Sequence, residues 1–192
     1  NIGFLMAPLL HSSMKHAVGP RREIGIKTIF NILGPLTNPA RATRQVIGVY
    51  DAKLTDIVAK VLKKLNTEHA FVVYGYDGMD EITTTDKTKV CELKDGEIKS
   101  YFITHDSFGI KKAEMKDFMV NSPEESASAI CAVLDGEVGP KRDIVLLNAS
   151  AAIVAGGGVE NLKDGVRLAA ESIDSGKAKA SLEKLIELTQ NN

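Results

Sequence analysis

The sequence predicts an α/β fold: a mixed, mostly parallel sheet with flanking helices and one antiparallel hairpin. The first observation is a strand, helix and strand pattern over residues 45–74, because two parallel strands need a crossover of this kind. The second is the pair of β-rich runs that flank Asp95-Gly96, a dipeptide typical of a tight antiparallel turn. The third is the helical character of much of the chain from residue 122 to residue 188.

Composition excludes several classes of protein. The 192 residues are 44% hydrophobic and 26% charged, which is ordinary for a soluble globular domain. The 24 basic residues are balanced by 25 acidic ones, so a nucleic-acid partner is not predicted. Cys91 and Cys131 have no metal-ligand spacing and are expected to be reduced thiols. No apolar run reaches the roughly 18 residues of a membrane span, and we expect a cytoplasmic protein without a membrane partner.

The first part of the chain is predicted to contain a short strand followed by helices. Phe4 to Ala7 is an apolar run and is expected to be a buried strand. Ser12 or Ser13 can cap a short helix. The next helix is expected to begin at Pro20 and to stop at Gly34-Pro35, because the residue before a proline is pushed out of the α region.

Arg21 is the candidate binding residue of this region. It lies in the first turn of the Pro20 helix, where the helix dipole is positive and a cation is unfavourable unless an anion comes to it. Its guanidinium presents a planar pair of donors that fits a carboxylate. Without further context, a solvated surface charge is the commoner interpretation of such an arginine.

Residues 45–74 are predicted to form a βαβ unit with a right-handed crossover. Its expected elements are the strand Gln45–Tyr50, the amphipathic helix Leu54–Leu65 and the strand His69–Tyr74. Ligands of such sheets gather beyond the carboxyl ends of the strands. Asp80 and Glu81 follow the second strand in a glycine-containing loop, and they offer the hard oxygen ligands that magnesium prefers. A solvated pair of carboxylates is the alternative interpretation.

The rest of the chain is expected to be a hairpin followed by helices. The hairpin strands are Thr88–Leu93 and Ile98–Ile103, and the helices are Ser122–Leu134, Arg142–Val154 and a pair between Leu162 and Leu188 that breaks near Asp174-Ser175-Gly176. Gly156-Gly157-Gly158 follows a helix, so we interpret it as a C-terminal cap and not as a phosphate cradle. His16, His69 and His105 have no spacing typical of a metal site.

Several segments together resemble a known family. The longest match consists of Arg21, Glu23, Gly25, Thr28–Asn31 and Leu33–Pro39. His11, Met14 and Lys15 match a second motif, although Ser12 stands where proline is usual. The Gly-x-Asp-Glu sequence that ends in Asp80-Glu81 matches a third. In these segments the chain is similar to the anthranilate phosphoribosyltransferases.

The resemblance implies a catalytic domain of the nucleoside phosphorylase and phosphoribosyltransferase type. It implies transfer of a phosphoribosyl group from phosphoribosyl diphosphate to the amino group of anthranilate, which releases pyrophosphate in tryptophan biosynthesis. It also implies that Arg21 binds the anthranilate carboxylate, while Asp80 and Glu81 serve two magnesium ions bound with phosphoribosyl diphosphate. The other implied anthranilate-binding residues are Ala7, Pro8, His11, Met14 and Gly34. No residue stands out as a catalytic base.

The resemblance also bears on domain organisation. Residues 1–12 and 41–192 are expected to form an incomplete C-terminal α/β catalytic domain, and residues 13–40 a helical segment that packs with an N-terminal helical domain. The sequence does not contain that domain or the family's glycine-rich pyrophosphate loop, so we expect the chain alone to be inactive. Because the family pairs two chains through its helical domain, a homodimer is implied. A pyrimidine-nucleoside phosphorylase-like enzyme and a nucleic-acid-binding relative of the same fold are the alternatives.

Overall fold

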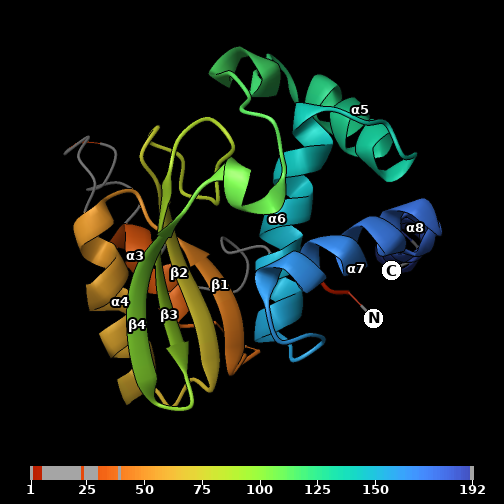
Figure 1. Ribbon diagram of the computed structural model, residues 1–192. Coiled ribbons are helices and arrows are strands. Elements are labelled where there is room, and N and C mark those ends of the chain that lie inside the picture. Colours follow the sequence, from red (N-terminus) through yellow and green to blue (C-terminus); the bar gives the residue numbers. More distant parts are fainter. Residues whose placement is uncertain (1, 6–22, 24–29, 39, 191–192) are drawn as a thin grey trace. The chain divides into compact units, whose positions relative to one another are not determined.

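The computed structural model describes residues 2–5, 23, 30–38 and 40–190 of the chain (Figure 1). The chain divides into two compact units, residues 1–42 and residues 43–192. The sheet and most of the described helices belong to the second unit.

The first unit contains helix α3, Phe30–Leu36, which runs through Gly34 and Pro35. The prediction that a helix stops at Gly34-Pro35 is therefore wrong. Pro35 lies one residue before the end of α3, where its missing N–H and its ring disturb only the last turn. The helix ends where the carbonyl of Leu33 accepts from the N–H of Thr37 at 3.0 Å and from its hydroxyl at 2.8 Å. The predicted start of this helix lies outside the described residues.

Phe4 and Leu5 do not form the predicted buried strand. They have no regular secondary structure, and they are 76% and 48% exposed. An apolar run becomes a strand only where a neighbouring strand satisfies its N–H and C=O groups. Within the described residues, all sheet pairing lies between residues 44 and 103. The prediction is wrong for these two residues, and its last two residues, Met6 and Ala7, lie outside the described part of the chain.

The second unit is built on a four-stranded sheet whose spatial order follows the order of the chain. The strands are β1 Arg44–Gly48, β2 His69–Gly75, β3 Thr88–Lys94 and β4 Glu97–Ile103. β1 and β2 are parallel, with Val46 opposite Phe71, and helix α4, Ala52–Lys64, connects them. Asp51 caps α4 by accepting the N–H of Lys53 at 2.8 Å. The predicted strand, helix and strand unit is confirmed.

The α/β class, the mixed sheet and the hairpin are confirmed, but the described sheet is not mostly parallel. β3 is antiparallel to β2 and β4 is antiparallel to β3, so one of the three pairings is parallel. The reason is that the chain returns from β2 through the loop of residues 76–87, here called the acidic loop, without a crossover helix. Asp95 and Gly96, with φ of 51° and 79°, make the tight turn between β3 and β4.

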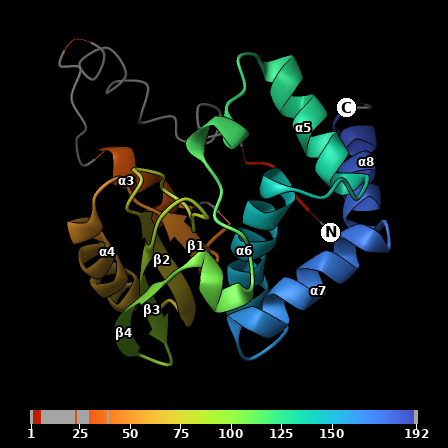
Figure 2. The same cartoon turned by 45° about the horizontal axis from the view of Figure 1, so that its top comes forward.

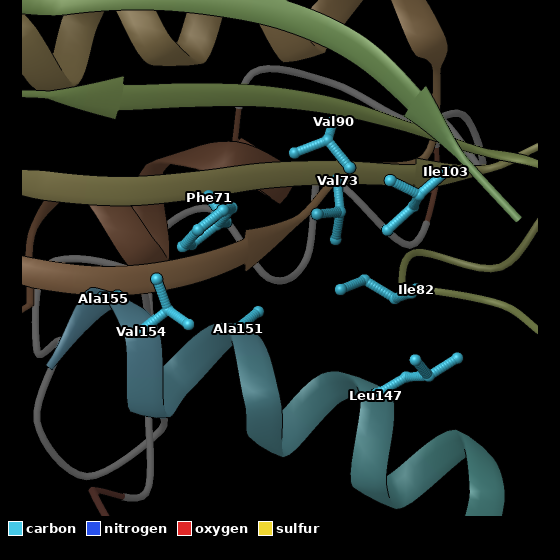
Figure 3. Packing of buried hydrophobic residues seen from close by; sticks show 9 residues of the cluster. All are labelled: Phe71, Val73, Ile82, Val90, Ile103, Leu147, Ala151, Val154 and Ala155. Carbon is cyan, nitrogen blue, oxygen red and sulfur yellow. The ribbon is translucent and has the colours of Figure 1, made fainter. Parts of the chain in front are cut away.

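Helices cover both faces of the sheet (Figures 1 and 2). α4 packs on β2 and β3 from one side and buries Val58, Ala59 and Leu62. Helix α6, Pro140–Ala155, packs on the other side. Figure 3 shows the core between α6 and the sheet, which consists of Phe71, Val73, Ile82, Val90, Ile103, Leu147, Ala151, Val154 and Ala155.

The opposite face of α6 packs against further helices. These are α5, Pro123–Leu134, and α7, Leu162–Asp174, and the last helix, α8, Lys177–Gln190, packs on α5 and α7. Ser122 caps α5 by accepting the N–H of Glu125 at 3.1 Å, as predicted. The N–H of Gly157 bonds back to the carbonyl of Val154 at 2.9 Å, which confirms that the three glycines terminate a helix. Over the described ranges, no helix is both long enough and apolar enough to cross a membrane.

Candidate functional site

Asp80 and Glu81 lie in the acidic loop, which leaves the carboxyl end of β2. The loop begins with a tight turn, in which the N–H of Gly75 donates to the carbonyl of Met79 at 2.8 Å. Gly78, with φ of 96°, adopts a backbone conformation that favours glycine. Because β1 and β2 are parallel, their carboxyl ends meet at this edge of the sheet. The two carboxylates are therefore placed where ligands of parallel strands gather.

Gly48 allows the acidic loop to lie directly against the end of β1. A Cβ atom at this position would lie 1.6 Å from the carbonyl oxygen of Asp80 and 2.6 Å from its carbonyl carbon. Those atoms belong to the main chain, so a side chain at position 48 would displace the loop backbone itself. The absence of a side chain at Gly48 thus sets the height of Asp80 above the sheet.

Asp77 closes the acidic loop upon itself. Its Oδ1 accepts the N–H of Met79 at 3.0 Å, and its Oδ2 accepts the hydroxyls of Thr83 and Thr85. Burial by itself raises the pKa of Asp77, but these hydroxyl and N–H donors outweigh burial, so the pKa lies below its usual value. Asp77 is an ionised carboxylate whose oxygens are already used inside the loop.

Asn148 joins the acidic loop to helix α6. Its Oδ1 accepts the N–H of Ile82 at 2.9 Å, and its Nδ2 donates to the carbonyl of Ile82 at 2.8 Å. The same Nδ2 donates to the carbonyl of Ile144, one turn earlier in α6, at 3.0 Å. The side chain of Ile82 is 1% exposed and belongs to the core between α6 and the sheet (Figure 3). The residue after Glu81 is therefore held through both its main chain and its side chain.

Asp80 and Glu81 themselves are exposed to solvent. Neither forms an ion pair with a described residue. The carboxyl of Glu81 is nevertheless shielded enough for burial, followed by the negative charges of Asp80 and Asp77, to raise its pKa above the usual value. Among the described residues, no ion pair compensates the negative charge of these two carboxylates, and this arrangement favours the binding of a cation.

The residues present fit magnesium. The described ranges contain no group of three or more His, Cys, Asp or Glu side chains that could enclose a metal ion. Magnesium does not need such a group, because it usually takes one or two carboxylates and completes its shell with waters and substrate phosphates. Asp80 and Glu81 fit this role, whereas the oxygens of Asp77 are occupied.

Most of the predicted anthranilate-binding residues lie outside the part of the chain that the structure describes. Arg21, Ala7, Pro8, His11 and Met14 lie outside the described residues, and their roles stay predictions. Gly34 is described: it is half-buried within α3 of the first unit, and a Cβ atom there would meet nothing within 4 Å.

The residues that hold the acidic loop were not singled out from the sequence. Gly48 carries a signal in the sequence, since a glycine inside a predicted strand, here Gln45–Tyr50, often marks a close approach of another segment. Asp77, Thr83 and Thr85 lie in a polar stretch whose composition is that of an ordinary loop, so the sequence does not single them out. Asn148 interrupts the apolar residues of α6, but its partner lies 66 residues away in the chain.

Comparison with known proteins identifies the family. Residues 1–179 match the family model described as "Glycosyl transferase family, a/b domain". The chain belongs to this glycosyl transferase family. Its α/β domain therefore has the family fold, with the acidic loop at the carboxyl end of β2.

Relatives in this glycosyl transferase family carry the predicted name. The chain is 50% identical over 190 residues to the anthranilate phosphoribosyltransferase of Acetivibrio thermocellus, and the aligned region covers 99% of this chain and 55% of the relative. It is 49% identical to the same enzyme of Methanobrevibacter smithii, covering 100% of this chain and 57% of the relative. The resemblance to anthranilate phosphoribosyltransferases is confirmed, and the chain spans about half the length of the relatives it matches.

Solved structures of the family have the same fold. Anthranilate phosphoribosyltransferase from Thermus thermophilus matches with a TM-score of 0.87 and 37% identity, over 96% of this chain and 55% of that one. The Saccharomyces cerevisiae enzyme in complex with PRPP and Mg matches with a TM-score of 0.87 and 32% identity, over 98% of this chain and 55% of that one. The yeast enzyme in complex with 4-fluoroanthranilate also matches, with a TM-score of 0.88 and 31% identity over 99% of this chain and 55% of that one.

Proposed function

We propose that this chain is the α/β part of an anthranilate phosphoribosyltransferase. The reaction is transfer of the phosphoribosyl group of phosphoribosyl diphosphate to the amino group of anthranilate, a step of tryptophan biosynthesis that releases pyrophosphate. The observation that carries the proposal is the exposed Asp80-Glu81 pair at the carboxyl end of β2. The yeast relative solved with PRPP and Mg supports it, since its fold matches over nearly the whole chain.

Asp80 and Glu81 are the residues that would hold magnesium. Displacement at the ribose carbon develops positive charge on the sugar and negative charge on the departing diphosphate. Magnesium, when bound with the donor, neutralises the diphosphate and so favours its departure. The chain's own contribution is to hold two carboxylates at a fixed height above β1 and β2. We propose that these two carboxylates serve two magnesium ions, whose remaining ligands are waters and phosphate oxygens.

Arg21 is the proposed anchor of the acceptor. The amino group of anthranilate is already a free base near neutral pH, so the reaction needs a held geometry more than it needs a proton acceptor. A guanidinium can hold the anthranilate carboxylate through two parallel hydrogen bonds. The other proposed lining residues are Ala7, Pro8, His11, Met14 and Gly34. The complex of the yeast relative with 4-fluoroanthranilate supports an anthranilate site in this family.

The parent protein is proposed to act in the cytoplasm as a homodimer. Residues 1–12 and 41–192 would form the C-terminal part of its catalytic domain, and residues 13–40 would pack with an N-terminal helical domain. The relatives are nearly twice as long as this chain. The remaining donor-binding groups are proposed to lie in the part of the parent protein that this chain does not span. The 192-residue chain alone is then expected to be inactive.

The first test measures the loss of anthranilate fluorescence in the presence of phosphoribosyl diphosphate and Mg²⁺. Two proteins are compared: the 192-residue chain, and a joined protein in which the part of the Acetivibrio thermocellus relative that this chain does not span precedes it. We expect fluorescence loss with the joined protein and none with the chain alone. A folded joined protein that leaves the fluorescence unchanged contradicts the proposed function, and an active chain contradicts the proposed division of labour.

Substitutions in the joined protein test the assigned residues. Asp80→Asn and Glu81→Gln should each lower the magnesium-dependent rate by about 100-fold or more, because metal ions supply several kcal/mol of charge stabilisation. Asp95→Asn is the control, since Asp95 is an exposed carboxylate in the β3–β4 turn and asparagine accepts its positive φ. Full activity of Glu81→Gln would overturn the metal assignment.

Arg21→Ala tests the acceptor site separately. It should raise the KM for anthranilate by roughly 10- to 100-fold, the equivalent of losing charged hydrogen bonds. The KM for phosphoribosyl diphosphate should change little. An unchanged dependence of the rate on anthranilate concentration would remove Arg21 from the proposed site.

A further inference from the structure

Asn148 makes three hydrogen bonds with its side chain, and two of them reach the acidic loop. Both loop bonds go to Ile82, one to its N–H at 2.9 Å and one to its carbonyl at 2.8 Å. The third bond, to the carbonyl of Ile144 at 3.0 Å, fixes the amide of Asn148 on its own helix. The loop is therefore tied to a side chain whose orientation is already set by α6.

The position of these bonds bears directly on Glu81. The N–H of Ile82 belongs to the peptide group whose carbonyl comes from Glu81, and a peptide group is planar. The carbonyl of Ile82 belongs to the next peptide group. Holding both groups leaves little freedom of rotation on either side of Ile82, so the Cα atom of Glu81, which lies in the first peptide group, has a fixed place.

A second contact restrains the other side of the carboxylate pair. The carbonyl oxygen of Asp80 lies so close to Gly48 that a Cβ atom there would be 1.6 Å away. The pair is thus held by β1 at Asp80 and by α6 immediately after Glu81. Both carboxylates, together with that of Asp77, carry like charges that repel one another unless a cation is bound. Without such restraint, the repulsion and the solvent exposure of the pair would let the two carboxylates separate.

We propose that Asn148 is a positioning residue that orients the Asp80-Glu81 pair for divalent-metal binding. Asn148 does not touch the metal in this proposal, and it acts only through the main chain of Ile82. The inference rests on the proposed function, because it assumes that Asp80 and Glu81 are the metal ligands. Residues that orient metal ligands typically contribute 10- to 100-fold to affinity, by a rough measure.

Two substitutions of Asn148 separate the loop bonds from the helix bond. Asn148→Ala removes all three bonds. Asn148→Ser removes the reach to Ile82, but its hydroxyl can still bond to the carbonyl of Ile144 in its own helix. Ser150→Ala is the matched control: Ser150 is a buried polar residue of the same helix, and its hydroxyl bonds to the carbonyl of Leu147 at 2.6 Å.

The first measurement is amide hydrogen exchange in the 192-residue chain under native conditions. In Asn148→Ser and Asn148→Ala, the N–H of Ile82 should exchange at least about tenfold faster than in the parent chain, because it loses its acceptor. Ser150→Ala should leave this N–H unchanged. Circular dichroism and thermal unfolding of each variant show whether the fold persists, and the serine variant retains the helix bond in case the alanine variant does not fold.

The second measurement is the binding of Mn²⁺, used as a paramagnetic probe of the Mg²⁺ site, to the joined protein with phosphoribosyl diphosphate present, to the same substitutions made in it, and to its Glu81→Gln variant. We expect the Mn²⁺ affinity to fall about tenfold in Asn148→Ser and to stay unchanged in Ser150→Ala. If Glu81→Gln weakens Mn²⁺ binding and Asn148→Ser does not, the positioning role is overturned while the metal assignment stands. If the unsubstituted joined protein binds Mn²⁺ no better than its Glu81→Gln variant, the metal assignment fails, and the positioning role fails with it.

Discussion

Gly48 shows how one missing side chain can set the geometry of a site. It is the last residue of β1, although glycine is a poor strand former, and its Cα faces the carbonyl of Asp80. The close approach brings the acidic loop onto the sheet edge, so the loop need not stand away from it. The height and direction of the two carboxylates thus depend on a residue that carries no chemistry of its own.

Gly48→Ala should therefore disturb both stability and metal binding. The new methyl group would lie 1.6 Å from a main-chain oxygen, and relieving that overlap requires movement of the backbone. We expect the free energy of unfolding in urea to fall by about 2 kcal/mol and the Mn²⁺ affinity to fall with it. Gly3→Ala is the control, since a Cβ atom at Gly3 meets nothing within 4 Å. An alanine variant with unchanged stability would show that the loop can move away freely.

At the scale of elements, an ionic cluster fastens α4 to the hairpin. Asp56 of α4 accepts from the ammonium of Lys89 in β3 at 2.5 Å and from the hydroxyl of Ser100 in β4 at 2.8 Å. Lys89 also donates to the carbonyl of Ala52 at 3.1 Å, at the start of α4. The hydrogen bond from Lys89 is the largest cause, and the bond from Ser100 the next, of a pKa for Asp56 that is lowered to about 2. One carboxylate thus connects three elements.

This cluster predicts a dependence of stability on pH. Because the pKa of Asp56 in the folded protein lies below its ordinary value of 3.8, its ionised form stabilises the fold above about pH 4. That contribution is lost as the pH falls from about 4 towards 2. Since the side chain of Asp56 is 40% exposed, screening by solvent reduces the contribution to about 1 kcal/mol.

The measurement is urea unfolding of Asp56→Asn and of the parent chain at several pH values. At pH 7 the variant should be less stable by about 1 kcal/mol, and the difference should shrink between pH 4 and pH 2. Asp95→Asn, in the β3–β4 turn, should show no comparable difference at pH 7. A difference that stays constant down to pH 2 would mean that the ionisation of Asp56 does not account for it.

At the scale of the second unit, α6 belongs to two hydrophobic cores. Leu147, 1% exposed, lies in the core shared with the sheet (Figure 3). Its neighbour Leu146, 7% exposed, lies in a core shared with α5 and α7, together with Val133, Ala169 and Ile173. Because one helix contributes to both cores, loss of either core should loosen the other. We therefore expect the second unit to unfold in a single transition.

Leucine-to-alanine substitutions test this coupling. Leu146→Ala and Leu147→Ala should each lower the free energy of unfolding by about 3 kcal/mol, through lost apolar contact and the cavity left behind. Val145→Ala, at a residue of α6 that is 41% exposed, should cost less than about 0.5 kcal/mol. In each variant, tyrosine fluorescence and far-ultraviolet circular dichroism should report the same midpoint.

The two probes examine different layers of the second unit. All four tyrosines lie between residues 50 and 101, in the part of the chain that forms the sheet, whereas circular dichroism mainly follows the helices. Separate midpoints for the two signals would show that the sheet and the helices unfold independently. The coupling through α6 would then be wrong.

The fold was largely predictable because its elements have strong local patterns. The helix expected at Leu54–Leu65 is found at Ala52–Lys64, and the Asp95-Gly96 turn joins β3 to β4. The errors occur where tertiary context decides. Phe4 and Leu5 are apolar, but in the described chain no strand pairs with them. Pro35 is a helix breaker by propensity, yet α3 continues past it for one residue.

The candidate site was predictable only in part, for a related reason. Asp80 and Glu81 were found from their types, their spacing and their place after a buried strand. Asn148 acts across 66 residues of sequence and Gly48 acts across 32, and each contact exists only after α6 and β1 have met the acidic loop. Local patterns name the groups that carry charge, whereas the groups that hold them in place emerge from the packed structure.

The way the acidic loop is held has a consequence for protein engineering. Gly48 meets the main chain and the Cβ atom of Asp80, and Asn148 meets the main chain of Ile82, so neither contact involves the carboxyl groups at positions 80 and 81. Those two side chains can be exchanged without dismantling the scaffold beneath them. If Asp80 and Glu81 hold the metal as proposed, other combinations of aspartate, glutamate, asparagine or histidine at these two positions should alter which divalent ion is preferred.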